Sequence, residues 1–235
     1  MARPSTPLLS PARIAAAALD LVREEGDFTV GALAARLGVN AASLYHHAPG
    51  GRAEIIDLMR EAIHGAIEVD DIRDSGASPR ERLDLWAERY REGLRRASAF
   101  APVYFGVTAK DRGTHVLYDV LIRILADAGV PLEERLAMAT LVDFVVVGSI
   151  GDERSPVPLW DGVPADLEAL AEVSPRFDTA ERSAAGYRLA MGVVLDRLDR
   201  YAEDAKRAAV AGGSAAPGEP ARTAQADVAP GAVEG

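Results

Sequence analysis

Three polar side chains in the middle of the chain have the types and spacing that catalysis or metal binding requires. Asp111, His115 and Asp119 follow one another at intervals of four residues, so that His115 and Asp119 share one face of a predicted helix. Such a set could bind a metal ion or transfer a proton, and Asp152 and Glu153 could join it. The chain has only four histidines and no cysteine, and it lacks a glycine-rich phosphate loop and a nucleophile motif. We therefore interpret these side chains as solvated charges and expect neither a metal nor a cofactor, although the enzyme remains an alternative.

A second polar cluster is Tyr45, His46 and His47, three consecutive residues at the end of "LGVNAASLYHH". They are either an unusual patch of core or a surface that contacts DNA. The answer depends on the elements that hold them.

Local signals predict two short helices here, joined by a sharp turn. Thr29 caps the first helix, whose Leu33 and Leu37 face inward. Gly38 can adopt the left-handed conformation that ends it, and Asn40 caps a second helix that runs through His47. Two helices joined by a short turn containing glycine are typical of a helix-turn-helix unit.

Composition narrows the class of protein. The 235 residues are 49% hydrophobic and 26% charged, without cysteine, which is typical of a soluble protein and excludes disulfides. No signal peptide or membrane-spanning run is evident, so we expect a cytoplasmic location and no membrane partner. The net charge is −10, but residues 1–60 are neutral, with six arginines and six acidic residues. Such a segment could bind DNA through few phosphate contacts, while a merely acidic cytoplasmic protein stays possible.

The spacing of apolar residues predicts an all-α protein with an N-terminal three-helix helix-turn-helix domain and a larger helical domain. Helices are expected at about 11–25, 30–37, 41–47, 51–67, 79–98, 100–108, 112–128, 132–151, 165–173 and 178–208. We predict a flexible arm at 1–9, the helix-turn-helix domain at 10–56, a ligand-binding and dimerisation domain at 57–208, and a disordered tail at 209–235.

"TVGALAARLGVNAASLYHHAPGGRAEIIDLM", preceded by "ARIAAAALDLVREEG", resembles the N-terminal domain of the TetR/AcrR family of transcriptional regulators. "LADAGVPLEERLAMATLVDFVVVGSIGDE" resembles the C-terminal domain of its tetracycline-repressor branch more loosely. The resemblance implies a homodimer that binds a palindromic operator, usually as a repressor, and is released by a small organic inducer.

The resemblance also implies a DNA-binding surface. Its residues are Thr29, Ala41, Ala42, Ser43, Tyr45, His46, His47 and Arg52. In the family, the positions of Thr29, Tyr45 and His47 contact phosphates, which fixes register rather than sequence. Base contacts then fall to the two alanines against thymine methyl groups, and to Ser43 or His46. Arg52 replaces the usual lysine of the fourth helix, and Gly31 stands where many relatives have a basic residue.

Aromatic residues in the second domain predict a pocket for a small organic inducer such as an aromatic compound, although core packing explains them as well. The candidates are His64, Trp86, Tyr90, Tyr104, Tyr118 and Phe144. Alignment of "VYFGVT" puts Tyr104 where tetracycline repressors bind the drug's magnesium through histidine, which argues against a tetracycline.

The family's dimer interface corresponds to the helices near 132–151 and 178–208. The last of these offers Tyr187, Met191, Val194, Leu195 and Leu198, a set that could equally be intramolecular core. A protein of the same fold that binds small molecules without binding DNA is the alternative function.

Overall fold

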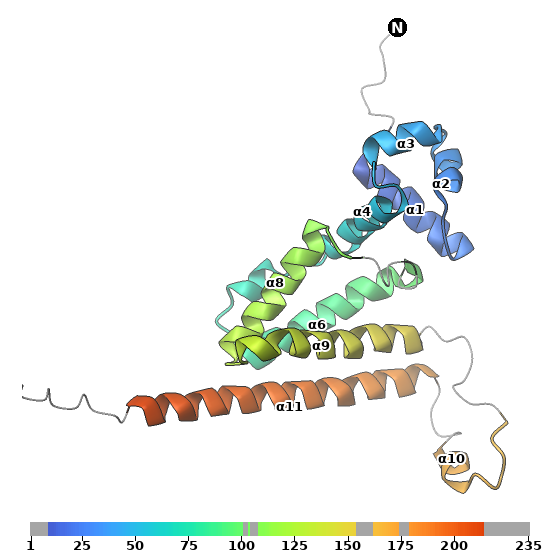
Figure 1. The fold of residues 1–235 in the computed structure, drawn as a ribbon. Coiled ribbons are helices and arrows are strands. Elements are labelled where there is room, and N and C mark those ends of the chain that lie inside the picture. The colour runs from blue at the N-terminus through green and yellow to red at the C-terminus, as the bar shows by residue number, and fades with distance from the viewer. Residues whose placement is uncertain (1–8, 101–102, 104–107, 154–161, 174–178, 214–235) are drawn as a thin grey trace, which may run out of the picture.

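The computed structural model describes residues 9–100, 103, 108–153, 162–173 and 179–213. Within these ranges every regular element is a helix. Figure 1 shows two groups of helices: α1, α2 and α3 gather near the first part of α4, and α8 and α6 pack toward its other end, with α9 and α11 on the far side of α6. The chain is therefore all-α, with a helix-turn-helix unit attached to a larger helical body, as the sequence predicts.

The first three helices of the N-terminal group begin and end at the predicted signals, whereas the fourth ends at His64 instead of continuing to residue 67. The group comprises α1 (Pro11–Glu25), α2 (Val30–Leu37), α3 (Ala41–His47) and α4 (Arg52–His64). Hydroxyl or amide oxygens of Ser10, Thr29 and Asn40 accept hydrogen bonds from the first turns of α1, α2 and α3. Gly38 ends α2 with φ of 69°, the left-handed conformation that the turn requires.

One apolar cluster holds this group together. Its fully buried members come from all four helices: Ile14, Leu33, Leu44, Ile55 and Met59. α4 is continuous across the domain boundary predicted at 56/57, and Ile63 near its end still packs in this cluster. Leu9, which we placed in the flexible arm, is only 6% exposed and belongs to the same cluster; residues 1–8 lie outside the described part.

The larger group supplies the second cluster. It comprises α5 (Asp70–Arg73), α6 (Pro79–Arg96), the 3₁₀ helix η1 (Ser98–Phe100), α8 (Arg112–Asp127), α9 (Leu132–Glu153), α10 (Glu168–Val173) and α11 (Thr179–Gly213). The short α5 was not predicted, and most of the helix expected at 100–108 lies outside the described residues. α11 continues to Gly213, into the predicted disordered tail, whose residues 214–235 are not described.

α9 and α11 lie alongside each other at the edge of the body (Figure 1). Their inner faces join α6 and α8 in the second apolar cluster, which includes Trp86, Leu121, Val142 and Val194. Among the described helices, none combines the length and hydropathy that crossing a membrane requires.

Candidate DNA-binding surface and ligand site

α3 exposes most of its side chains to solvent, and a single buried side chain anchors it to the core of the N-terminal group. Leu44 is 1% exposed, whereas the neighbouring Tyr45 is 49% exposed. Ala41, Ala42, His46 and His47 are also exposed, so the predicted division into one inward anchor and an outward face agrees with the structure. The consecutive polar residues therefore form a surface rather than a patch of core.

Two of the predicted DNA-contacting residues also take part in helix capping. Thr29 Oγ1 accepts a hydrogen bond from the Ala32 backbone N–H at 3.0 Å and is exposed at the start of α2. The half-buried Ser43 donates its hydroxyl to Asn40 Oδ1 at 2.9 Å. Ser43 is thus partly engaged within α3, which leaves Tyr45, His46 and His47 as the polar groups that extend freely from it.

Tyr45 packs against the turn that leads into α4. Gly51 has a φ of 61°, and a Cβ atom there would lie 3.2 Å from Tyr45 Cε1. A side chain at this position would be strained by the backbone conformation and would also push the ring away. The glycine therefore helps to position the phenol at the surface.

Arg52 is more engaged than the sequence suggests. Its guanidinium lies 2.7 Å from Asp27 Oδ1 and donates to the Phe28 carbonyl, and its Cζ lies 4.5 Å from the centre of the Phe28 ring. The hydrogen bond from Arg52 is the main cause that lowers the pKa of Asp27. A DNA phosphate would therefore have to compete with these partners for Arg52.

Two carboxylates of α4 accept hydrogen bonds from backbone N–H groups at and just before the start of α8. The Gly113 N–H donates to Glu61 Oε2 at 2.6 Å, and the Lys110 N–H donates to Asp57 Oδ1 at 3.4 Å. A Cβ on Gly113 would lie 2.6 Å from the Gly65 backbone nitrogen, so only glycine permits this approach. No local sequence pattern predicts this contact, because the residues that it joins are about fifty positions apart in the chain.

His64 adds a buried side-chain contact to the same junction. Its Nδ1 lies 2.6 Å from Thr114 Oγ1, and the Thr114 hydroxyl donates to Asp111 Oδ2 at 3.0 Å. Asp111 Oδ2 in turn lies 3.8 Å from Arg60 Nη1. Burial lowers the pKa of His64 to about 4, although the charge of Asp111 acts in the opposite direction. His64 is therefore neutral at physiological pH.

Four of the six predicted pocket residues come together. Trp86 is fully buried and donates Nε1–H to the Leu117 carbonyl at 3.0 Å. The Trp86 ring centre lies 5.0 Å from that of Tyr90 and 6.3 Å from that of Tyr118, and the Tyr90 and His64 centres are 5.8 Å apart. We call these four residues the aromatic cluster.

The other two candidates do not join the aromatic cluster. Tyr104 lies outside the described residues. Phe144 is 72% exposed on the outer face of α9, because it lies two residues from each of the buried Val142 and Val146 and so points to the opposite side of the helix. Its place is on the predicted dimerisation surface rather than beside Trp86.

Sequence reasoning missed Asp143 as a member of this site. Its Oδ2 accepts a hydrogen bond from the Tyr118 hydroxyl. Burial raises the pKa of Asp143, while hydrogen bonds from Tyr118 and Tyr90 oppose the rise. The one available signal was that Asp143 is the single acidic residue within the apolar run of residues 136–151.

The acidic residues considered for catalysis have separate structural partners, and Asp111 is not the solvated charge that the sequence predicts. Asp111 is buried and caps α8 through the Thr114 N–H, whereas His115 is exposed. Asp119 pairs with Arg123 at 2.8 Å. Among the described residues, no group of three or more His, Cys, Asp and Glu side chains is arranged to hold a metal ion.

α9 and α11 carry an outward apolar surface, which we call the α9–α11 face. Its exposed members are Leu132, Leu136, Phe144, Leu189 and Val193. Met191, Val194, Leu195 and Leu198, which we considered for dimer contacts, are instead buried within this chain's own core.

The sequence matches no protein-family model and no curated protein, but the fold is similar to those of solved regulators. Apo ActR from Streptomyces coelicolor superposes with a TM-score of 0.67 at 21% identity, over 86% of this chain and 100% of ActR. A possible TetR-family regulator from Streptomyces coelicolor A3(2) gives 0.67 at 24% identity, over 80% and 98%.

A TetR variant from Acinetobacter baumannii, solved with minocycline, gives a TM-score of 0.60 at 21% identity, over 82% of this chain and 97% of that one. ActR has also been solved in complex with actinorhodin. A helix-turn-helix unit on a helical body, superposed over nearly the whole of these proteins, identifies the architecture: the chain has the fold of the TetR-family regulators.

Proposed function

We propose that the chain is a ligand-responsive transcriptional repressor that acts in the cytoplasm. In this proposal a homodimer binds a palindromic operator through α3, and a small organic inducer releases it. The observation that carries the proposal is the exposed row of Tyr45, His46 and His47 on a helix anchored by Leu44 alone. Tyr45 and His47, with Thr29, would contact phosphates, while Ala41, Ala42, Ser43 and His46 would meet base edges.

The proposed dimer forms through the α9–α11 face. Large apolar side chains such as Leu136, Phe144 and Leu189 are each more than 70% exposed there. Several large apolar side chains exposed on two neighbouring helices are more than isolated surface apolar residues and favour a protein–protein interface here. A second copy packed on this face would form a four-helix interface and would present two α3 helices to successive major grooves.

The proposed inducer site is the aromatic cluster together with Asp143. Aromatic rings with a few buried polar groups are typical of small-molecule sites. Minocycline and actinorhodin, found with two proteins of this fold, are polycyclic organic molecules, which favours a ligand of similar size. We do not expect a metal-chelated tetracycline, for the reason given from the sequence.

The α4–α8 junction would link the two sites. Tyr90 of the aromatic cluster contacts His64, which contacts Thr114, and Glu61 on the same turn of α4 bonds to Gly113. Ligand that favours a different position of α6 would therefore displace α4 and the attached α3. The change in DNA affinity is limited by how much more tightly the ligand binds one conformation of the protein than the other.

Fluorescence anisotropy with labelled DNA from the region upstream of the gene, across a salt series, tests the proposal. We expect two subunits per site and a shallow dependence on salt, because few cations lie on the neutral N-terminal segment. The paired variants Tyr45→Phe and His47→Gln should weaken binding to all sequences alike. A dimer that binds its upstream DNA no better than random DNA at low salt would contradict the proposal.

One observation favours the alternative, a small-molecule-binding protein without DNA binding. Arg52 is bound by Asp27 and the Phe28 carbonyl, although 41% of its side chain stays exposed, so its guanidinium already has partners within the protein. Under the alternative, the labelled upstream DNA binds no better than random DNA. The same anisotropy experiment therefore separates the two functions.

A further inference from the structure

The start of α4 belongs to the proposed DNA-binding surface, and its arginine is bound within the protein. Arg52 is the first residue of α4, and the capping residue Gly51 makes no side-chain hydrogen bond to that end of the helix. An arginine beside a helix N-terminus is a typical phosphate contact, because the guanidinium and the first backbone N–H groups both attract negative charge. The partners of Arg52 in the structure therefore decide whether DNA can use it.

Arg52 makes three contacts with the loop between α1 and α2. Its Nη2 lies 2.7 Å from Asp27 Oδ1, and its Nη1 donates to the Phe28 carbonyl. Its Cζ lies 4.5 Å from the centre of the Phe28 ring, which is 2% exposed and belongs to the core of the N-terminal group. The carbonyl and the buried ring fix where the guanidinium lies, and Asp27 supplies the negative charge beside it.

Asp27 is itself placed where a phosphate is expected. Its side chain is 66% exposed, and it is two residues before Thr29, which caps α2 and is a proposed phosphate contact. A carboxylate resembles a phosphate in its charge and in the way it accepts hydrogen bonds from a guanidinium. A second carboxylate acts alike at the same end of α4, where Glu54 Oε2 accepts a hydrogen bond from the Gly50 backbone N–H at 2.7 Å. Side chains of this chain thus bind two of the donors that a phosphate would use there.

We propose that Asp27 is an internal substitute for a DNA phosphate and keeps Arg52 out of the protein–DNA contact. A phosphate that displaced Asp27 would lie next to an unpaired carboxylate, and the repulsion between these two negative groups opposes the exchange. Asp27 is also attached to the same domain as Arg52, so it binds the guanidinium without an association step. Asp27 is thus a residue that sets the affinity for DNA, an inference that rests on the proposed function.

The neutral charge of residues 1–60 reflects pairs of this kind. Arg36 of α2 pairs with Glu24 of α1, so a second arginine of the helix-turn-helix unit is neutralised by a neighbouring acid. Phosphate contacts carry no sequence information, so an arginine withheld from phosphate lowers the affinity for every DNA sequence by the same factor. It also makes binding less dependent on salt, because fewer counterions are released. Sequence preference is left to the exposed side chains of α3.

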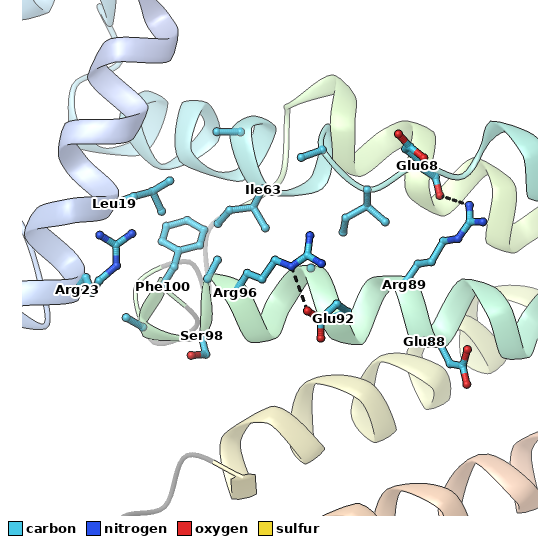
Figure 2. Close-up of a pocket in the computed structure, with 16 residues that line it drawn as sticks. Leu19, Arg23, Ile63, Glu68, Glu88, Arg89, Glu92, Arg96, Ser98 and Phe100 are labelled. Carbon is cyan, nitrogen blue, oxygen red and sulfur yellow. Dashed lines mark hydrogen bonds and ion pairs between the residues drawn. The ribbon is translucent and has the colours of Figure 1, made fainter.

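Another ion pair of the N-terminal group provides a matched control. Arg23 and Asp20 of α1 pair at 2.6 Å with side chains that are 64% and 49% exposed, so this pair is about as accessible as the one at α4. Arg23 lies at the edge of a cavity that α6 and η1 also line, next to Phe100 (Figure 2). This pair therefore faces the larger group of helices, and the loss of its acid changes the net charge without freeing a cation at the start of α4.

Fluorescence anisotropy of the full chain with labelled upstream DNA and with random DNA, across a salt series, tests the proposal. Asp27→Asn removes the charge and keeps the shape of the side chain, and it should tighten binding to both DNAs about fivefold at low salt, the upper end of what an exposed ion pair contributes. The slope of log affinity against log salt should steepen by about 0.9, the value of one added phosphate contact. Asp20→Asn should change the affinity less than about twofold, and Asp27→Asn should do no more than this control when it is combined with Arg52→Gln.

An NMR titration of the Asp27 carboxyl checks the pair without DNA. The hydrogen bond from Arg52 lowers the pKa of Asp27, so this pKa should return toward its ordinary value in Arg52→Gln. An unchanged pKa would mean that the pair does not form in solution and would overturn the proposal.

Equal affinities of Asp27→Asn and Asp20→Asn for DNA, or an unchanged salt slope, would also overturn it. A wild type that shows no preference for its upstream DNA contradicts the proposed repressor function instead, and the comparison of the variants on random DNA still applies. If neither the wild type nor Asp27→Asn binds any DNA at low salt, the inference and the proposed function both fail.

Discussion

The α3 surface and the aromatic cluster are the two proposed binding regions, and they are built in opposite ways. α3 is seven residues long, is set by the Asn40 cap and the Gly38 turn, and presents its polar residues to solvent. The aromatic cluster is assembled from α4, α6 and α8, and Trp86 within it is fully buried. Recognition residues on α3 can therefore change with little effect on folding, whereas the cluster serves the core and any ligand at once.

Replacement of Trp86 by alanine should give the largest effect on stability. It removes a fully buried ring and its hydrogen bond to the Leu117 carbonyl, and such truncations cost about 3–5 kcal/mol. Urea denaturation would measure the loss in the free energy of unfolding. Trp86→Phe should cost distinctly less. A loss below about 1 kcal/mol for the alanine variant would show that the aromatic cluster does not stabilise the core. The contrast between a buried cluster and an exposed α3 surface would then be weaker.

The pH dependence of stability should reveal His64 within the same region. Its pKa of about 4 in the folded protein lies below the ordinary histidine value of 6.5, so the unfolded chain binds the proton first as the pH falls. The free energy of unfolding should therefore decrease between pH 6.5 and 4 by up to about 1.4 kcal/mol per pH unit from this residue. Below pH 4 both states are protonated and this contribution stops changing.

Urea denaturation of the wild type and His64→Gln at several pH values checks this prediction. At pH 8 the two differ only by the lost packing and hydrogen bonding of the side chain. Toward pH 4 the wild type should lose stability faster than the variant, so the gap between the curves should narrow. Parallel curves across this range would mean that His64 is not buried as the structure places it.

The same contrast explains how much could be predicted from the sequence. Caps at Ser10, Thr29 and Asn40 and the turn at Gly38 act within a few residues, so the helix-turn-helix unit and the exposed face of α3 could be predicted. Contacts such as Glu61 with Gly113 join segments that no local pattern connects. Asp143 and the partners of Arg52 were missed for this reason.

Helix periodicity alone could not separate the two sides of α9 and α11. Leu132, Leu136 and Phe144 are outward, whereas Met138, Val142 and Val146 are buried, yet all are apolar in sequence. A helix that is apolar on most sides gives no signal for which side meets its own core. Phe144 was assigned to the pocket for that reason.

Gly38→Ala should show how strongly the local turn specifies α3. Gly38 has a φ of 69°, which costs a residue with a Cβ about 1–2 kcal/mol. Thermal and urea unfolding should both show the loss. Gly31→Ala is the matched control inside α2, where the nearest atom to the new Cβ is Thr29 Oγ1 at 3.9 Å; it should instead stabilise the protein by roughly 0.5–1 kcal/mol. If both alanine variants change the free energy of unfolding by the same amount and sign, the left-handed turn at Gly38 is not what positions α3.

Tyr45→Phe should give the smallest effect on stability and a clear effect on DNA binding. The ring is 49% exposed and keeps its packing beside Gly51 in the variant, so the free energy of unfolding should change by no more than about 0.5 kcal/mol. The lost hydroxyl removes one phosphate contact, so the affinity for operator and random DNA should fall by a similar factor, because such contacts position the protein without specifying sequence. A large loss of stability with unchanged DNA binding would instead make Tyr45 a packing residue. It would then belong with Trp86, and the distinction between an exposed recognition surface and a buried cluster would no longer hold.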